Sequence, residues 1–225
     1  MKVSVKTPAT IANLGPGFDS FGLALPLYNI VSVEETVLPG SGIEINIINE
    51  KNNEERNIID IPTDKNNIVY KAIELLYNFI GQVPNELKIT IKTQIPISRG
   101  LGSSASVIVG GLIAANELLG RVTDEKVLLS IATEIEGHPD NIAPAFKGGV
   151  MMSSWEEDGS VVCRNLPWND DWKLMVCIPD YELNTDVSRS VLPKEVPMAS
   201  AIYNLKRSAM FVDALYNKDE ELLKL

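Results

Sequence analysis

Apolar side chains recur at every second position in several short stretches of the chain. Val3 and Val5 begin this pattern, and residues 87–95 set leucine and isoleucine against lysine and threonine. A period of two is typical of strands that are buried on one face. We therefore predict strands at the N-terminus and over 28–37, 43–48, 87–95, 148–154, 160–163 and 173–178.

Other stretches repeat their apolar residues with the three-and-four spacing of amphipathic helices. Two of these stretches run directly into Gly81 and Gly120, and glycine commonly follows the last helical residue. We predict helices over 66–80 and about 103–119. A third helix should be capped by Thr123 or Asp124 and end before Gly137-His138-Pro139, and a last one should begin at about 199. The polar residues 49–57 should form a turn.

The composition changes this picture little. The chain has 225 residues, of which 45% are hydrophobic and 22% charged, so it suits one large domain or one domain and part of a second. No apolar run approaches the roughly 20 residues of a membrane helix, and the first residues lack a signal-peptide pattern. We therefore expect a cytoplasmic protein with no membrane partner.

Charge and reactive side chains narrow the possible ligands. The net charge is −10 and the basic residues are scattered, which is unfavourable for nucleic-acid binding. The only histidine, His138, excludes metal sites built from several histidines. Cys163 and Cys177 lie in apolar surroundings, and we expect both to be buried free thiols.

The segment PISRGLGSSAS, residues 96–106, is a candidate phosphate loop. Gly100 and Gly102 let backbone N–H groups approach a ligand, and Ser103 and Ser104 fall in the first turn of the next helix, where phosphate binds well. The Ser104 hydroxyl can also hold Mg²⁺. A simple glycine turn with a serine helix cap remains an alternative. The Walker A lysine is missing.

The same loop also has the spacing Gly-x-Gly-x-x-Ala, which occurs in dinucleotide-binding proteins. That pattern requires an acidic residue at the end of a second strand about 20 residues on. Asp124 and Glu125 lie at that distance, but they occur where a helix begins. The dinucleotide interpretation is therefore the weaker alternative.

Two further clusters carry polar side chains that could form a site. Glu134 lies near the end of a predicted helix and Asp140 and Asn141 lie in the loop beyond, an arrangement that suits a metal or a hydroxyl substrate. The alternative is a solvated helix end with an Asp-Asn turn. We expect His138 to be a structural hydrogen-bonding residue.

The second cluster is the glycine-rich loop from Asn13 to Asp19, whose two ends present polar side chains. Arg189 could hold a carboxylate through two parallel hydrogen bonds. Taken alone, the loop could equally be a turn-rich connection and Arg189 a surface residue.

Together these segments resemble one family, the GHMP kinases. PISRGLGSSAS resembles the central ATP motif of that family, Pro-x-x-x-Gly-Leu-Gly-Ser-Ser-Ala. The segments NLGPGFDSFGLAL (13–25), EGHPDNIAPAFKGGV (136–150) and NTDVSRSVLP (184–193) are similar to the homoserine kinase branch. The four motifs occur in the family order along the chain.

The resemblance implies an α+β fold with two domains. The first, residues 1–166, would be an ATP-binding domain like ribosomal protein S5 domain 2, and residues 167–225 would begin the C-terminal GHMP kinase domain. The family also has a C-terminal Gly-x-Gly-Pro loop and a further substrate arginine, and neither occurs here. We therefore expect a truncated or abridged second domain.

The resemblance also implies cofactors, substrates and residue roles. ATP and Mg²⁺ would be the cofactors, L-homoserine the substrate, and a homodimer the possible assembly. Mg²⁺ would bind to Ser104 and Glu134, and homoserine to Asn13, Asp19, Asp140 and Arg189. Asn141 and Thr185 would lie near the γ-phosphate and the attacking hydroxyl. ATP would bind to the loop residues Pro96, Ile97, Ser98, Arg99, Gly100, Leu101, Gly102, Ser103, Ser104, Ala105 and Ser106.

The implied reaction is phosphorylation of the homoserine side-chain hydroxyl in threonine biosynthesis. Whether Asp140 acts as a general base or only binds substrate is open, and we favour binding. A kinase for mevalonate, shikimate or another small alcohol, an NAD(P)-binding oxidoreductase, and a non-catalytic nucleotide-binding remnant are the alternatives.

Overall fold

The structure is a computed structural model of the 225-residue chain. It describes residues 1–36, 40, 42–49, 61–84, 86–178, 180–181 and 185–224. Most of the predicted turn at 49–57, the last position of the predicted strand 28–37, and Asn184 of the fourth motif lie outside these residues.

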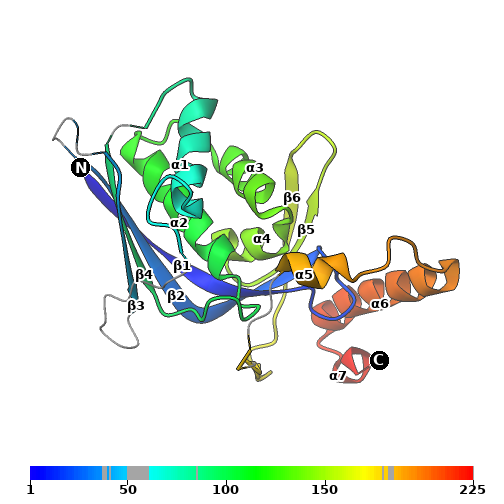
Figure 1. The fold of residues 1–225 in the computed structure, drawn as a ribbon. Helices are drawn as coiled ribbons and strands as arrows, with labels where there is room; N and C mark the ends of the chain where they lie inside the picture. Colours follow the sequence, from blue (N-terminus) through cyan, green and yellow to red (C-terminus); the bar gives the residue numbers. More distant parts are fainter. Residues whose placement is uncertain are drawn as a thin grey trace.

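In the described part of the chain, six strands form one curved sheet (Figure 1). Its order is β3-β4-β2-β5-β6, and β1 pairs with β2. Only the β3–β4 pair is parallel among these pairings. The strands are β1 (Lys2–Ala12), β2 (Phe21–Glu35), β3 (Glu44–Asn49), β4 (Leu87–Thr93), β5 (Val150–Trp155) and β6 (Val161–Leu166).

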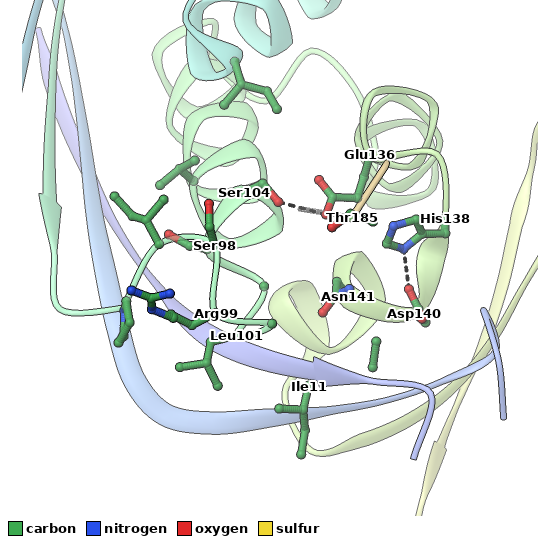
Figure 2. Close-up of a pocket in the computed structure, with 18 of the residues that line it drawn as sticks. Ile11, Ser98, Arg99, Leu101, Ser104, Glu136, His138, Asp140, Asn141 and Thr185 are labelled. Atoms are coloured by element: carbon green, nitrogen blue, oxygen red, sulfur yellow. Dashed lines mark hydrogen bonds and ion pairs between the residues drawn. The ribbon is translucent and has the colours of Figure 1, made fainter. Parts of the chain in front are cut away.

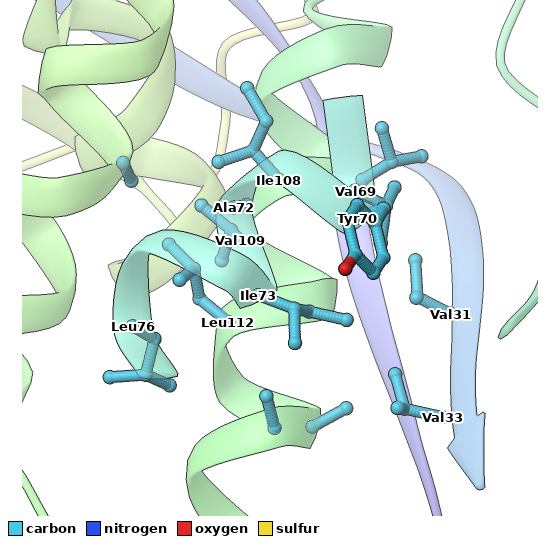
Figure 3. Close-up of a cluster of buried hydrophobic side chains, with 14 of the residues drawn as sticks. Val31, Val33, Val69, Tyr70, Ala72, Ile73, Leu76, Ile108, Val109 and Leu112 are labelled. Carbon is cyan, nitrogen blue, oxygen red and sulfur yellow. The ribbon is translucent and has the colours of Figure 1, made fainter. Parts of the chain in front are cut away.

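Four helices cover one face of this sheet (Figure 1). They are α1 (Ile68–Phe79), α2 (Ser103–Leu118), α3 (Glu125–Glu136) and α4 (Pro139–Lys147). Helix α2 lies centrally, against β1 and β2 on one side and α1 on the other. Figure 3 shows the resulting core, in which Val31 and Val33 of β2 face Ile73 of α1 and Ile108 and Leu112 of α2. These positions are the apolar ones of the predicted strand and helix patterns.

The pairing of β1 with β2 contains a bulge that matters for the site. Pro8 pairs with Tyr28 but the next residue, Ala9, pairs with Leu25, so two residues of β2 are skipped. Bulges re-aim the side chains that follow them. Thr7 bonds to α2 and Thr10, three positions on, bonds to α4, so both side chains point to the helical face.

The C-terminal part of the chain contains α5 (Thr185–Ser190), α6 (Met198–Asn217) and α7 (Glu220–Leu223). Helix α6 packs on the other face of the sheet, whereas α5 lies on the side of the four helices, next to α4 (Figure 1). Phe211 of α6 lies 5.1 Å, ring centre to ring centre, from Phe21 of β2. Leu215 is buried in the same cluster, beside Leu166 of β6. The helix predicted from about 199 is thus confirmed as α6.

Three predictions are wrong in the described structure. Residues 173–178 pair with none of the described strands and form no strand themselves, and Met175 is 87% exposed. Cys177 is exposed and Cys163 half-buried, although both thiols are free as expected. Helix α4 begins at Pro139, where we had predicted a loop. Among the described residues, no helix is long and apolar enough to cross a membrane.

Candidate active site

A cavity of about 760 Å³ opens at one end of α2 and α4 (Figure 2). One part of its wall is the loop before α2, another is the first turn of α4, and α5 closes a third side. The lining residues are Ile11, Ala12, Asn13, Phe18, Ile47, Ile61, Asn67, Ile68, Val69, Ile91, Thr93, the run 96–104, Val107, Glu136, His138, Asp140, Asn141, Thr185, Ser188, Arg189 and Leu192.

The loop before α2 has the backbone of an anion site. Ser98, Gly100 and Gly102 have φ angles of 54°, 70° and 58°, in the left-handed region, and they alternate with Arg99 and Leu101. Such alternation turns successive N–H groups to one side and forms a concavity that binds anions. Helix α2 then begins at Ser103, with unpaired N–H groups of its own. This geometry favours the phosphate-loop interpretation.

The serine-cap alternative is wrong, since the N-cap residue of α2 is Gly102 and no side chain caps it. Residues 96–104 all line the cavity, as predicted. Ala105 and Ser106 do not, because the helix turns them toward the sheet. Ser106 is fully buried, and its hydroxyl bonds to Thr7 of β1.

The carboxylate beside Ser104 is Glu136 and not Glu134. Ser104 Oγ donates a hydrogen bond of 2.9 Å to Glu136 Oε1, and Figure 2 shows the two side chains pointing toward each other. Glu134 is exposed and lies outside the lining of the cavity. Two residues are about 200° of helical rotation, so these two side chains leave α3 in nearly opposite directions.

Burial controls the ionisation of Glu136. It raises the pKa of the carboxyl above its ordinary value, while the hydrogen bond from Ser104 and the positive charge of His138 partly counteract this rise. A desolvated carboxylate of this kind gains from a cation at close range. Oxygen ligands from Ser104 and Glu136 suit a hard divalent cation such as Mg²⁺.

Helix α4 presents Asp140 and Asn141 from its first turn, which corrects their predicted place in a loop. Pro139 is the first helical residue, where a missing N–H costs nothing. Gly22 of β2 allows this helix end to approach, because a Cβ there would lie 1.8 Å from the carbonyl oxygen of Asp140. The close contact between β2 and α4 therefore fixes how far the side chains of Asp140 and Asn141 lie from the sheet.

His138 precedes α4 and bonds to Asp140, as expected for a structural hydrogen-bonding residue. Its Nδ1 lies 2.5 Å from Asp140 Oδ1, and Asp140 is 1% exposed. Burial lowers the pKa of His138, but the hydrogen bond to Asp140 and the charges of Asp140 and Glu136 outweigh it, so the pKa is raised. These contacts therefore favour the charged form of the His138 imidazole.

Arg189 lines the cavity and pairs with Asp19, which is not itself among the lining residues. Arg189 donates two hydrogen bonds to the Asp19 carboxylate, of 3.0 Å from Nη1 and 2.5 Å from Nη2. Asn13 Oδ1 accepts the backbone N–H of Asp19 at 3.0 Å and shapes this loop. Thr185 lines the cavity one turn before Arg189 in α5. Two predicted site segments, the loop from Asn13 to Asp19 and helix α5, are thereby brought together.

Sequence reasoning missed the apolar end of the cavity. Ile47, Ile61, Ile68 and Ile91 line it, together with Asn67, whose Oδ1 caps α1 through the N–H of Val69. Their apolar pattern is the pattern of core residues, so no signal in the sequence separated cavity wall from core. A buried polar cap residue such as Asn67 was the one available indication.

Arg99 also lines the cavity, although its side chain had no expected role beyond the loop. One guanidinium nitrogen, Nη1, is shielded from solvent and makes no hydrogen bond to the described residues. In Figure 2 the side chain points away from Ser104 and Asn141. Arg99 therefore does not simply extend into solvent.

Comparison with known proteins identifies the family. The GHMP kinases N terminal domain matches residues 67–149. A homoserine kinase of Carboxydothermus hydrogenoformans is 43% identical over 229 residues, covering 99% of this chain and 70% of that protein. A homoserine kinase of Petrotoga mobilis is also 43% identical and covers 98% of this chain and 69% of that protein.

The chain belongs to the homoserine kinases, a branch of the GHMP kinase family. Solved structures of this branch agree: the homoserine kinase of Cytophaga hutchinsonii has a TM-score of 0.80 at 27% identity, covering 99% of this chain and 70% of that one. A putative homoserine kinase from Listeria monocytogenes has a TM-score of 0.73 at 28% identity, covering 100% and 74%. The predicted family and its α+β fold are confirmed.

A homoserine kinase fold also rules out the dinucleotide alternative. In a Rossmann unit the glycine loop joins a strand to a helix, and that helix leads directly to a neighbouring parallel strand. Here α2 follows the loop, and the chain then passes through α3 and α4 to β5, which pairs antiparallel with β2. The division into domains at 166 and 167 coincides with the end of β6 but stays a prediction.

Proposed function

We propose that the protein transfers the γ-phosphate of ATP to the side-chain hydroxyl of L-homoserine and forms O-phospho-L-homoserine. The observation that carries the proposal is the Asp19–Arg189 pair, whose arginine lines the same cavity as the phosphate loop. An amino acid has an ammonium and a carboxylate group on one carbon. A carboxylate and a guanidinium held side by side match those two charges.

The nucleotide would occupy the loop end of the cavity. The backbone N–H groups of residues 98–102 and the N-terminus of α2 face the phosphates, and the apolar side chains of β3, β4 and α1 offer a surface for the base. The overall charge of −10 makes such a local anion site necessary.

Mg²⁺ would be held by Ser104 and Glu136, and it would neutralise charge on the phosphates. The donor set fits, since both are oxygen ligands and they lie within hydrogen-bonding distance of each other. We therefore replace Glu134 by Glu136 in the proposed metal site.

The homoserine ammonium would lie between Asp19, Asp140 and the amide oxygen of Asn13, and its carboxylate against Arg189. Substrate binding would exchange one ion pair for two, because the zwitterion inserts its own charges between Asp19 and Arg189. The side-chain hydroxyl then points toward Asn141 and Thr185, which line the cavity between the substrate end and the loop.

Transfer requires the hydroxyl oxygen to bond to the γ-phosphorus while the bond to the β-phosphate oxygen breaks and ADP leaves. The hydroxyl proton passes to the transferred phosphate. Asp140 is buried and already bonded to His138, which favours a binding role over that of a general base. The protein mainly positions the reactants and neutralises charge, as phosphoryl transfer demands.

The test is ADP release from Mg²⁺-ATP with homoserine, mevalonate, shikimate and galactose as separate acceptors. We expect turnover with homoserine alone, and mass spectrometry should find the phosphorylated amino acid. Stronger turnover with another alcohol would overturn the proposed substrate. Binding of ATP without turnover on any acceptor would favour a nucleotide-binding remnant.

Homodimer formation remains an expectation from the family resemblance. Light scattering at several protein concentrations would measure it.

A further inference from the structure

Thr10 of β1 connects the phosphate loop to the first turn of α4. Its hydroxyl donates a hydrogen bond of 2.8 Å to Oδ1 of Asn141, and its backbone N–H donates one of 3.1 Å to the carbonyl oxygen of Leu101. Thr10 itself is fully buried. One residue of the sheet thus contacts two separate walls of the cavity without lining it.

The hydrogen bond determines which end of the Asn141 amide faces the cavity. An asparagine amide has an acceptor oxygen and a donor nitrogen on opposite sides. Because Oδ1 accepts from Thr10, Nδ2 lies on the other side of the amide, away from Thr10. Asn141 lines the cavity, so its two N–H donors are available to a phosphate oxygen.

Without the Thr10 hydroxyl, the Asn141 amide would lose the hydrogen bond that favours this orientation. The amide could rotate by half a turn and present Oδ1 to the transferred phosphoryl group, and two oxygen acceptors repel each other. The backbone of Gly102 packs closely against both side chains and leaves them little room to move, since a Cβ at this residue would lie 1.9 Å from Thr10 Oγ1 and 2.9 Å from Asn141 Oδ1. The three groups are packed in direct contact.

We propose that Thr10 is a positioning residue for the kinase reaction, which holds the amide of Asn141 so that its N–H₂ group faces the transferred phosphate. The proposal rests on the proposed function above, since it needs a phosphoryl group in the cavity. The bulge after Pro8 makes the arrangement possible, because it turns Thr10 to the helical face that Thr7 already occupies.

Steady-state kinetics of Thr10→Val test the proposal. The substitution keeps the shape of the side chain and removes the donor. We expect kcat to fall about 10- to 100-fold, the range for an unmade hydrogen bond at a buried group, with both KM values within about twofold. Thr10→Ser keeps the hydroxyl and should recover most of kcat.

Thr7→Val is the matched control. Thr7 lies on the same strand and is equally buried, and its hydroxyl donates 2.8 Å to the carbonyl oxygen of Ser106 in α2, away from Asn141. We expect a loss of Tm similar to that of Thr10→Val and a nearly unchanged kcat. An equal fall of kcat in both variants would show a general effect of the strand and overturn the proposal.

A double-mutant cycle with Asn141→Ala supplies the decisive comparison. Thr10→Val should cost little further kcat once Asn141 is alanine, because its effect passes through that amide. Full additivity, or an unchanged kcat in Thr10→Val, would overturn the positioning role while leaving the kinase function intact. A wild-type protein that phosphorylates no alcohol would overturn both proposals.

Discussion

The two ends of the cavity are built in different ways. The phosphate loop is one continuous run, residues 96–104, and its shape follows from left-handed residues within that run. The substrate end combines a loop after β1, the first turn of α4 and α5, and its Asp19–Arg189 pair joins residues 170 positions apart. We therefore expect a local backbone motif to serve one substrate and long-range packing of side chains to serve the other.

The difference predicts where each end is vulnerable. At the loop, the backbone conformation supplies the donors, so a change of conformation should matter more than the identity of a side chain. At the substrate end, single charged side chains carry the recognition. Ser104 and Glu136 join the two ends, since one comes from the loop and the other from the end of α3.

The largest effect is expected at that junction. Glu136→Gln keeps the size of the side chain but removes the charge that would hold Mg²⁺, which contributes several kcal/mol to transition-state stabilisation, so kcat should fall about 10³-fold. Glu134→Gln is the control, because that side chain is exposed outside the cavity. Kinetics over a range of Mg²⁺ concentrations measure both. An equal loss in the two variants would contradict the assignment.

The pH dependence of the same variant should sharpen this assignment. The folded pKa of Glu136 is raised by burial, so the wild-type carboxyl is protonated at a higher pH than an ordinary glutamate, and activity should begin to fall at correspondingly higher pH on the acid side. For stability, a raised folded pKa contributes below the unfolded pKa and is lost as pH rises through the folded value. Glu136→Gln should therefore gain Tm relative to wild type at pH 8 and lose this gain near pH 4.

A smaller effect is expected from a methyl group in the loop. Gly102→Ala places a Cβ 1.9 Å from Thr10 Oγ1 at a left-handed residue, and we expect kcat/KM for ATP to fall about 100-fold. Gly100→Ala is matched, since it is also left-handed but has nothing within 4 Å of the new Cβ. Its kcat/KM for ATP should fall only about 10-fold, because the left-handed conformation costs a residue with a Cβ roughly 1–2 kcal/mol. Similar losses in both would show that contact with Thr10 is unimportant.

The smallest effect is expected at Arg189. Arg189→Ala removes the proposed partner of the substrate carboxylate and should raise the homoserine KM at least about tenfold, with little change in the KM for ATP. Arg207→Ala on α6, whose guanidinium lies over the Tyr203 ring outside the cavity, is the control. An unchanged homoserine KM would remove Arg189 from the substrate site and with it the main support for an amino-acid substrate.

Much of the fold was predictable because its elements are periodic. The strand at 87–93 and helices α1, α2, α3 and α6 lie close to the predicted ranges. Helix α4 was missed since Pro139 was read as a stop, whereas proline is well placed at the first position of a helix. Residues 173–178 have the composition of a strand, but pairing partners and not composition decide whether a strand forms.

The sequence indicated most residues of the site, but it did not indicate which of them contact one another. All of the loop 96–104, and the residues Asn13, Asp140, Asn141, Thr185 and Arg189, line the cavity, whereas Asp19 does not, and their roles stay predictions. The choice between Glu134 and Glu136 depends on the rotation of α3 relative to α2, for which the sequence has no signal. The apolar wall of the nucleotide end could not be separated from the core, because both are apolar and periodic.

The sequence by itself determined the local chemistry: a glycine-rich turn before a helix, acidic and amide side chains after another, and the motifs that identify a homoserine kinase. Only the tertiary structure decided which side chains meet. It placed Glu136 at Ser104 and Arg189 at Asp19, and through the bulge in β2 it turned Thr10 to Asn141, although alternation from Val3 and Val5 would turn Thr10 away. Backbone preferences act between neighbours in sequence, whereas contacts across the fold depend on the register and rotation of packed elements.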